Sequence, residues 1–277
     1  MEKKIAIVTG ASSGIGEATA ELLARSGYTV YGTSRKGAPV AQRSYKMLAL
    51  DVTSDASVES AVSAVIKLEG RIDLLVNNAG FGVAPGGAEE SSIEQTRQIF
   101  DTNFFGLIRM TRAVMPHMRK QGGGRILNIG SILGLIPAPY MATYAATKHA
   151  VEGFSESLDH EVRTQGIRVS VIEPAYTKTA FDANTKELDA QLPEYAQARK
   201  ALNKLLKIGL AAGDDPKVVA EVVLKAANAR QPKLRYPAGK MAGRLSVLRR
   251  FAPAALFDMA IRKDMKLDEL DKIANQA

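Results

Sequence analysis

The chain has 277 residues, of which 46% are hydrophobic, and it carries no cysteine, three histidines and a formal net charge of +8. This composition suits a substantial core and excludes a disulfide framework and thiolate metal sites. The histidines, at positions 117, 149 and 160, are too scattered to indicate a metal site, so no metal is expected. The basic residues are spread along the chain without stacking aromatic residues beside them, so nucleic acid is not an expected partner. Because no run of about 18 apolar residues occurs, we expect a cytoplasmic protein without a membrane span.

Apolar segments recur through the first two-thirds of the chain and alternate with helical patterns. Strands are expected over 4–10, 29–35, 46–52, 72–80, 124–131 and 167–174. Continuous apolar runs such as Ile5–Val8 and Leu74–Val76 are typical of strands covered on both faces, which indicates a parallel sheet. The alternation predicts an α/β fold, a Rossmann-type doubly wound parallel sheet with helices on both faces. Ligands of such folds bind at the carboxyl ends of the strands.

Capping residues place the helices between these strands. Helical segments over 13–27, 54–70 and 143–166 end in glycine, and Ser54 or Asp55 is the expected N-cap of the second. Asp215 and Pro216 begin a further helix. Residues 182–213 are expected to be helical but irregular, residues 232–237 contain a last short strand, and the tail from Gly239 forms a C-terminal helical extension. Without repeats or linkers, we expect a single domain over 1–277, with a cofactor-binding core over about 1–180, a substrate lid over about 180–215 and a tail over about 239–277.

The segment VTGASSGIGEA, residues 8–18, follows the first expected strand and opens the first helix. Gly10, Gly14 and Gly16 allow a tight turn, close approach of the backbone to a pyrophosphate, and close packing of helix on strand. The free N–H groups and the dipole of the helix would hold the phosphates. The same letters match the nucleophile elbow of α/β-hydrolases at Ser12. That alternative requires an oxyanion donor from an earlier loop of the sheet, and none precedes the first strand, so dinucleotide binding is favoured.

The end of the second strand indicates which nicotinamide cofactor is bound. An NAD site places an acidic residue about 20 residues after the glycines to hold the ribose hydroxyls. No acidic residue occurs between Glu21 and Asp51, and the strand ends in Ser34, Arg35 and Lys36. A guanidinium pairs with a 2′-phosphate, which a carboxylate would repel. NADP(H) is therefore favoured over NAD(H), the alternative being that these basic residues merely coat a surface loop.

Tyr144 and Lys148 stand four residues apart in YAATKHAVEGF, residues 144–154. Residues at this spacing are neighbours on any helix, so the pair alone is a weak signal. Reduction of a ketone by hydride leaves an alkoxide that needs a proton, and a tyrosine with a pKa of about 10 is a poor base in the reverse direction. A lysine ammonium one helical turn away, together with a cationic nicotinamide ring, would stabilise the phenolate. At about 4 Å one such charge is worth roughly 4 kcal/mol at most, or about three pKa units. Ser131, at the end of an expected strand, can donate a hydrogen bond to the substrate oxygen.

Several motifs occur together and in order: TGASSGIG (9–16), LDV (50–52), NNAG (77–80), TNFFG (102–106), NIGS (128–131) and the tyrosine–lysine pair. The chain thereby resembles the short-chain dehydrogenase/reductase family, closely over residues 1–180 and loosely beyond, where its tail is similar to the hydroxysteroid- and retinol-dehydrogenase-like branch. The resemblance implies that Asn103, Ser131, Tyr144 and Lys148 are catalytic, with Asn103 supporting a proton relay and Lys148 also binding the ribose. It implies a cofactor site made of Gly10, Ser12, Ser13, Gly14, Ile15, Gly16, Ser34, Arg35, Asp51, Val52, Asn78, Ala79, Gly80, Tyr144, Lys148, Pro174, Thr177 and Thr179. It also implies a homo-oligomer, a dimer or a tetramer.

One position departs from the family pattern. In EPAYTKT, residues 173–179, Ala175 stands where glycine is common, and this is acceptable unless the position needs a positive φ.

Apolar residues surround the expected site and indicate an apolar alcohol or ketone as the substrate. They are Leu133, Leu135, Ile136, Pro137, Met141 and Phe181. The tail alternates arginines with large apolar residues, which is more typical of a packed helix with a solvated face than of contact with a membrane surface. The sequence therefore predicts an NADP(H)-dependent oxidoreductase acting on an alcohol or carbonyl, most simply as a reductase. The alternative is a non-catalytic nucleotide-binding regulatory protein on the same fold.

Overall fold

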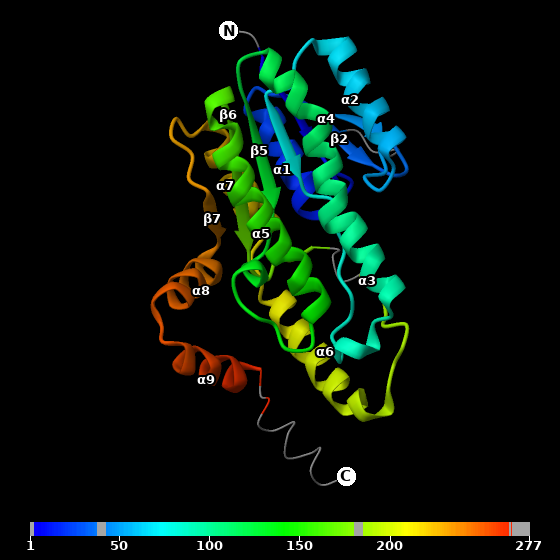
Figure 1. Cartoon of the computed structure of the whole chain (residues 1–277), viewed down its shortest axis with the longest axis vertical. Coiled ribbons are helices and arrows are strands. Elements are labelled where there is room, and N and C mark those ends of the chain that lie inside the picture. Colours follow the sequence, from blue (N-terminus) through cyan, green and yellow to red (C-terminus); the bar gives the residue numbers. More distant parts are fainter. Residues whose placement is uncertain (1–2, 38–42, 180–184, 266, 268–277) are drawn as a thin grey trace.

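The computed structural model describes residues 3–37, 43–179, 185–265 and 267. These residues form a seven-stranded sheet in the order β3-β2-β1-β4-β5-β6-β7, and every neighbouring pair is parallel (Figure 1). The strands are β1 (Ile5–Val8), β2 (Thr29–Ser34), β3 (Lys46–Ala49), β4 (Leu74–Asn77), β5 (Gly124–Ile129), β6 (Ile167–Pro174) and β7 (Arg235–Ala238). The expected doubly wound parallel sheet is confirmed. Most strands end before the polar turn residues that the sequence pattern had included in them.

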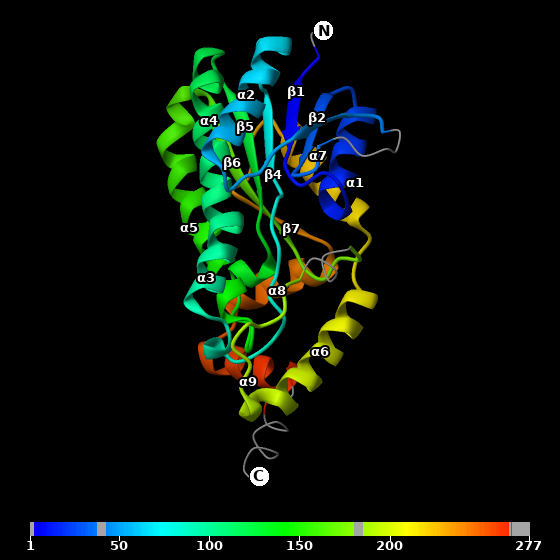
Figure 2. The same ribbon diagram turned by 90° about the vertical axis from the view of Figure 1, so that its right-hand side faces the viewer.

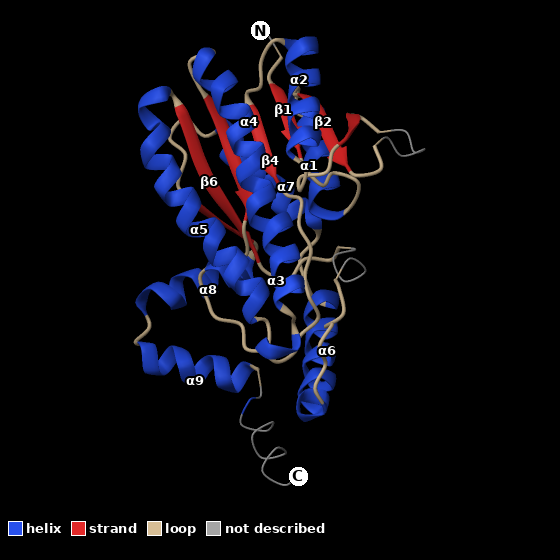
Figure 3. Cartoon of the chain, turned by 45° about the vertical axis from the view of Figure 1, so that its right-hand side comes forward, coloured by secondary structure: helices blue, strands red, loops and turns tan. Residues whose placement is uncertain are grey.

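Helices pack over both faces of this sheet (Figure 3). They are α1 (Gly14–Arg25), α2 (Asp55–Glu69), α3 (Ile93–Phe100), α4 (Gly106–Lys120), α5 (Ala142–Val162), α6 (Ala196–Ala211), α7 (Pro216–Asn228), α8 (Lys240–Phe251) and α9 (Ala254–Asp264). The expected caps are present: the Ser54 hydroxyl accepts from the Ser57 N–H at 3.3 Å, and Asp215 accepts from the Lys217 N–H at 2.8 Å. Gly70 ends α2 with a φ of 73°.

Alternate residues of each strand enter two separate hydrophobic layers. In β1, Ile5 and Ile7 belong to the layer that includes Val62 of α2, Met110 of α4 and Leu158 of α5. Their neighbours Ala6 and Val8 belong to the layer on the other face, with side chains of α1 and α7. Because both faces of the strands are buried, their sequences are apolar throughout rather than alternating.

Two segments differ from the sequence-based expectation. Residues 93–120, to which the sequence pattern assigned no element, form α3 and α4 joined by a π-helical turn over Asp101–Phe105. Within 182–213, expected to be helical, α6 begins only at Ala196. The preceding chain pairs with the segment after β4 instead, because Lys186 accepts from the Ala84 N–H and donates to the Gly82 carbonyl, both at 2.9 Å. These bonds occupy backbone groups that a helix would need.

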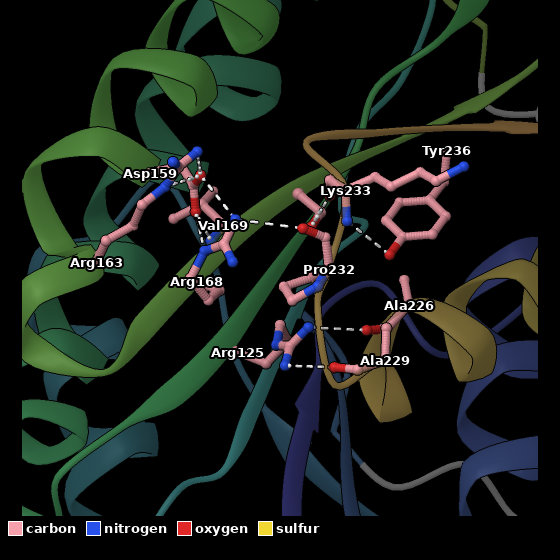
Figure 4. Close-up of polar contacts among 11 residues, drawn as sticks. Arg125, Asp159, Arg163, Arg168, Val169, Ala226, Ala229, Pro232, Lys233 and Tyr236 are labelled. Carbon is pink, nitrogen blue, oxygen red and sulfur yellow. Dashed lines mark hydrogen bonds and ion pairs between the residues drawn. The ribbon is translucent and has the colours of Figure 1, made fainter.

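The C-terminal half of α5 is fastened to the sheet by a buried carboxylate (Figure 4). Asp159, fully buried, accepts hydrogen bonds from Arg163 at 2.5 Å, from Arg168 at 2.9 Å and from the Val169 N–H at 2.9 Å. Burial raises the pKa of Asp159, but these donors outweigh it and lower the pKa to about 2. Nearby, the Arg125 guanidinium of β5 donates to two carbonyls at the end of α7, each at 3.1 Å. The Asp159 contacts thus fix α5, the helix that carries Tyr144 and Lys148, and the Arg125 contacts join the end of α7 to β5.

The helices α6, α8 and α9 gather at one end of the molecule, opposite the N-terminus (Figures 1 and 2). This is the end to which the parallel strands point, so these helices lie beyond the carboxyl edge of the sheet. The expected C-terminal helical extension is thus present as α8 and α9. In the part of the chain that the structure describes, no helix combines the length and apolar character needed to cross a bilayer.

Candidate active site

The loop between β1 and α1 is shaped to receive an anion. Gly10 and Gly14 have positive φ angles, 66° and 60°, and a Cβ atom on Gly16 would fall 2.3 Å from the Gly10 carbonyl oxygen. Ser13 occupies the N-cap position of α1 but its side chain makes no capping hydrogen bond. The first N–H groups of α1 therefore remain available to a phosphate, as the sequence predicts for a dinucleotide.

Asn78, directly after β4, holds this loop in place. Its side-chain amide donates to the Thr9 carbonyl at 2.9 Å and to the Gly10 carbonyl at 3.1 Å. In return, the Thr9 hydroxyl accepts from the N–H groups of Asn78 and Ala79 at 2.9 and 3.0 Å. The loops after β1 and β4 are thus joined at the position where the strand order reverses, which is where ligands bind in doubly wound folds.

Asn103 lies in the π-helical turn between α3 and α4 and is 3% exposed. Its side chain pairs with the backbone of Phe81 in both directions, accepting from the N–H at 3.0 Å and donating to the carbonyl at 2.9 Å. A Cβ on Gly80 would lie 3.0 Å from the Asn103 Oδ1. A weaker bond of 3.4 Å to Thr147 joins Asn103 to α5. Asn103 therefore fixes the loop after β4 against the helix that carries Tyr144.

Ser131, Tyr144 and Lys148 come together at the carboxyl end of β5. Ser131 follows this strand, accepts from the Leu133 N–H at 3.1 Å, and shares a side-chain hydrogen bond with Tyr144. Lys148 is buried, with its Nζ 3.0 Å from the Ile129 carbonyl oxygen and 5.7 Å from the centre of the Tyr144 ring.

Burial dominates the electrostatics of this group. It raises the pKa of Tyr144, and the hydrogen bond with Ser131 only partly opposes the shift. Burial also lowers the pKa of Lys148 to about 8, against the attraction of Glu152. Between the protein side chains alone, the cost of burying a phenolate exceeds the effect of an ammonium that points to the Ile129 carbonyl, so the pKa of Tyr144 is raised rather than lowered. The further contribution expected from a cationic nicotinamide ring stays a prediction. Tyr144 keeps its proton at neutral pH and is poised as an acid.

A cavity of about 430 Å³ is lined by all four expected catalytic residues and by part of the expected cofactor site. Those that line it are Ile15, Asn78, Gly80, Asn103, Ser131, Tyr144, Lys148, Pro174, Thr177 and Thr179. Its other walls are largely apolar and come from the segment after Ser131 and from α6, α8 and α9: Leu133, Ile136, Pro137, Met141, Leu206, Leu210, Met241, Leu245, Leu248, Phe257 and Ile261. Leu135 does not line the cavity but packs with Phe257 behind it. Phe181 lies outside the described residues.

The remaining expected cofactor residues lie outside this cavity. Gly10, Gly16 and Ala79 belong to the joined loops described above, while Ser13 and Gly14 line an open depression that shares Thr179 with the cavity. Ser34 ends β2 and the exposed Arg35 follows it, and the Ser34 hydroxyl donates to the Gly37 carbonyl at 3.0 Å. Asp51 and Val52 follow β3. The Asp51 carboxylate accepts from the N–H and hydroxyl of Thr53 at 2.9 and 2.7 Å, and Val52 is buried beside Gly106.

Arg43 is a neighbour of the glycine loop that the sequence did not indicate. Its guanidinium donates to the carbonyls of Ala11 and Ser12 at 3.0 and 2.9 Å and forms an ion pair with Glu17 at 3.0 Å. It also contacts the hydroxyl of Tyr45. No spacing signal marks this residue, because its position depends on which loop it packs against.

The alanine at position 175 fits its loop. The described residues contain one non-glycine residue with positive φ, Tyr140 at 63°, so Ala175 occupies an ordinary conformation. Its carbonyl accepts from the Thr177 hydroxyl at 3.2 Å. Thr179 packs against Gly14, where a Cβ would lie 3.1 Å from the threonine Cβ. The loop after β6 therefore reaches the glycine loop as expected, despite the substitution.

The fold and the anion-binding loop define a dinucleotide-binding α/β protein. The model of the short chain dehydrogenase family matches residues 4–190, and the chain belongs to this family of NAD(P)-binding oxidoreductases. It is 38% identical over 243 residues to 3-ketodihydrosphingosine reductase of Bacteroides thetaiotaomicron, covering 87% of this chain and 90% of the relative. It is 34% identical over 246 residues to 3-oxoacyl-[acyl-carrier-protein] reductase of Vibrio cholerae, covering 87% and 95%.

Solved structures share the whole architecture. A short-chain dehydrogenase from Streptomyces avermitilis superposes with a TM-score of 0.78 at 31% identity, covering 100% of this chain and 99% of the other. Similar structures hold either form of the cofactor. A Burkholderia phymatum family member in complex with NAD has a TM-score of 0.76, 26% identity and coverages of 90% and 92%. Serine dehydrogenase complexed with NADP+ has a TM-score of 0.72, 27% identity and coverages of 86% and 95%.

Proposed function

We propose that the protein is an NADP(H)-dependent reductase that interconverts a carbonyl and an alcohol on an apolar substrate. The observation that carries this proposal is the cavity in which Ser131, Tyr144 and Lys148 meet a largely apolar wall. A polar reacting end inside an apolar pocket suits a carbonyl attached to a hydrocarbon chain.

Each polar side chain has a separate role in this reaction. The bound nicotinamide supplies or accepts the hydride. The Ser131 hydroxyl donates a hydrogen bond to the substrate oxygen and orients it. Tyr144, protonated at neutral pH, gives its proton to the oxygen as negative charge develops there. The Lys148 ammonium stabilises the phenolate that remains and binds the ribose, and Asn103, which fixes the loop at Gly80 against α5, supports the proton relay.

The preference for NADP(H) rests on charge at the end of β2. Arg35 is exposed there, no acidic residue occurs between Glu21 and Asp51, and the Asp51 Oδ1 accepts from both the N–H and the hydroxyl of Thr53. Arg43 places a second guanidinium on the carbonyls of the glycine loop, paired there with Glu17. We expect Arg35→Asp to weaken NADPH binding about 100-fold, because a carboxylate repels the 2′-phosphate, while NADH binding changes little. Fluorescence titration with both nucleotides measures this, and an equal loss for both would argue against the phosphate contact.

A long-chain ketone is the substrate class we propose. Both relatives named above are reductases of a 3-keto or 3-oxo group, and the cavity extends along apolar side chains of α6, α8 and α9. Helix α6 belongs to the proposed lid (about 180–215), and α8 and α9 belong to the proposed tail (about 239–277) beside the cofactor-binding core (about 1–180). The test is a panel of 3-ketodihydrosphingosine, a 3-oxoacyl thioester and short ketones, with loss of NADPH absorbance as the readout. Tight NADPH binding without turnover of any ketone would favour the regulatory alternative.

Removal of one oxygen atom tests the proposed acid. Tyr144→Phe is expected to reduce kcat by about 10²–10⁴-fold, because the proton for the substrate oxygen must then come from water. NADPH affinity is expected to stay within a factor of about three. Retained turnover in this variant would rule out Tyr144 as the proton donor.

A further inference from the structure

The face of α5 that carries Tyr144 and Lys148 also carries a buried acidic residue one turn further on. Glu152 follows Lys148 by four residues on the same face and is only 5% exposed. Beside it, in β6, lies Glu173, which is fully buried. Arg235 of β7 stands between them, with its Nε 2.9 Å from the Glu152 Oε2 and 3.6 Å from the Glu173 Oε1. Its Nη2 bonds the more exposed Glu156 at 2.9 Å.

This cluster has more carboxylate oxygen than donors to satisfy it. In the described part of the chain, neither oxygen of Glu173 nor the Oε1 of Glu152 has a hydrogen-bond partner. A buried oxygen without a donor destabilises the fold, and the cost is greater when the oxygen is charged. One guanidinium cannot neutralise two buried carboxylates and Glu156 as well. A proton on one of the two carboxyl groups removes a charge and provides the missing donor.

The pKa shifts of Glu152 and Glu173 agree with this shortage of hydrogen-bond donors. Burial and repulsion from Glu152 raise the pKa of Glu173 to about 8, with Arg235 opposing the shift. Burial also raises the pKa of Glu152, but Arg235 lowers it through both charge and a hydrogen bond. Arg235 therefore favours Glu152 as the ionised partner and Glu173 as the protonated one.

The carboxyl group of Glu152 lies against the same segment that Lys148 contacts. Lys148 donates to the carbonyl of Ile129, while the Glu152 Oε1 faces the next residue, Gly130, whose Cβ would lie 3.2 Å away. The Glu152 Cγ would likewise stand 3.0 Å from a Cβ on Gly134. Two glycines of the segment around Ser131 thus leave room for this acid beneath the active site. Its negative charge opposes the loss of the Lys148 proton that burial promotes, as the direction of the pKa effect indicates.

We propose that Glu152 and Glu173 hold one proton between them, and that the negative charge they retain keeps Lys148 protonated through turnover. The inference rests on the proposed role of Lys148 and makes Glu152 a positioning residue that acts through the lysine. The other charged or titratable groups that face Glu152 are Arg235, Glu156 and His149. Glu173 adds a second contribution at higher pH. When it loses its proton near pH 8, the additional negative charge opposes the loss of the proton from Lys148.

The test is the alkaline limb of the pH profile of kcat for ketone reduction. Glu152→Gln is expected to move this limb to lower pH by about one unit, because one charge within several ångströms is worth at least that much. Glu173→Gln is expected to move it in the same direction by less, and only above about pH 8. The matched control is Glu156→Gln, which removes the same charge from the same helix and from the same arginine, and should leave the limb unchanged.

Two outcomes would overturn the proposal. One is a Glu152→Gln limb that coincides with that of the wild type, and the other is a uniform loss of kcat at every pH, which is the signature of a structural role.

A second measurement does not need turnover. The pH dependence of acetylation of Lys148 by acetic anhydride, followed by peptide mass spectrometry, reports the lysine pKa directly, with the same order of shifts expected. If no ketone is reduced but the acetylation midpoints shift as stated, the proposed function fails while the coupling stands. Unshifted midpoints refute the coupling, and if Glu152→Gln does not fold, the Glu173→Gln midpoint decides.

Discussion

Helix α5 carries a buried carboxylate cluster in each half, and the two clusters are built in opposite ways. Asp159, near the C-terminal end, accepts from two arginines and a backbone N–H, and its pKa falls to about 2. Glu152 and Glu173, nearer Lys148, share one half-buried arginine, Arg235, and the pKa of Glu173 rises to about 8. The satisfied acid fastens the helix to the sheet. The pair Glu152 and Glu173 lacks donors and retains one charge and one proton close to the catalytic lysine. Burying these carboxyl groups without enough donors lowers the stability of the fold.

The largest expected effect comes from breaking the satisfied cluster. Asp159→Asn should lower the free energy of unfolding by about 3 kcal/mol, because two arginines lose their counter-charge and one of the two acceptor oxygens is replaced by an NH2 donor. Denaturation by guanidinium at pH 7 measures it, with Glu161→Gln, an exposed acid on the same helix, as the control. The folded-state pKa of Asp159 is depressed, so its contribution is present above about pH 4 and lost as the pH falls through 2. The difference between variant and wild type should therefore shrink in acid; a difference independent of pH would contradict the assignment.

At the cluster of Glu152 and Glu173, removing a carboxylate is expected to stabilise the protein rather than destabilise it. Glu173→Gln should raise the free energy of unfolding at pH 8 by on the order of 1 kcal/mol, because the variant need not bury a second carboxylate. The folded-state pKa of Glu173 is raised from 4.5 to about 8, so its contribution is present below pH 4.5 and lost as the pH rises through 8. The gain should therefore be greater at pH 8 than at pH 5.5. A loss of stability at both values would place Glu173 with Asp159 as a purely structural acid.

The smallest expected effect separates the two donors of Asp159. Arg163 is 44% exposed and Arg168 is 25% exposed. Arg163→Ala should cost about 0.5 kcal/mol, as for an exposed pair one helical turn apart. Arg168→Ala should cost more, since Arg168 also donates to the Pro232 carbonyl at 3.2 Å. Urea denaturation of both variants measures the two losses in the free energy of unfolding. Equal losses would show that the exposure of the arginine does not determine its contribution.

Local pattern was sufficient for much of the fold and for the centre of the site. Continuous apolar runs marked the buried strands, and glycines, serine and aspartate marked the helix ends, because these signals are confined to a few neighbouring residues. Asn103, Ser131, Tyr144 and Lys148 all line one cavity, as their order along the chain had indicated. Their individual roles in catalysis remain predictions.

What the sequence did not reveal depends on contacts between distant residues. Arg235 meets Glu152 across 83 positions, and only the pairing of β7 with β6 brings it beside Glu173. Arg43 reaches the glycine loop in the same way. Spacing likewise gives the position of the Lys148 ammonium but not the depth of burial, which raises the pKa of Tyr144 in the structure.

The π-helical turn over Asp101–Phe105 has a consequence for the length of this segment. Such a turn holds one more residue than an α-helical one, so α3 and α4 could be joined smoothly by deleting a single residue. A helix turns by about 100° per residue, so that deletion would swing Asn103 away from Phe81 if α4 kept its place on the sheet. The deletion would make the helix more regular, but it would remove the hydrogen bonds by which Asn103 holds the loop at Gly80. Insertions and deletions should therefore be far less tolerated between 101 and 105 than their helical surroundings suggest.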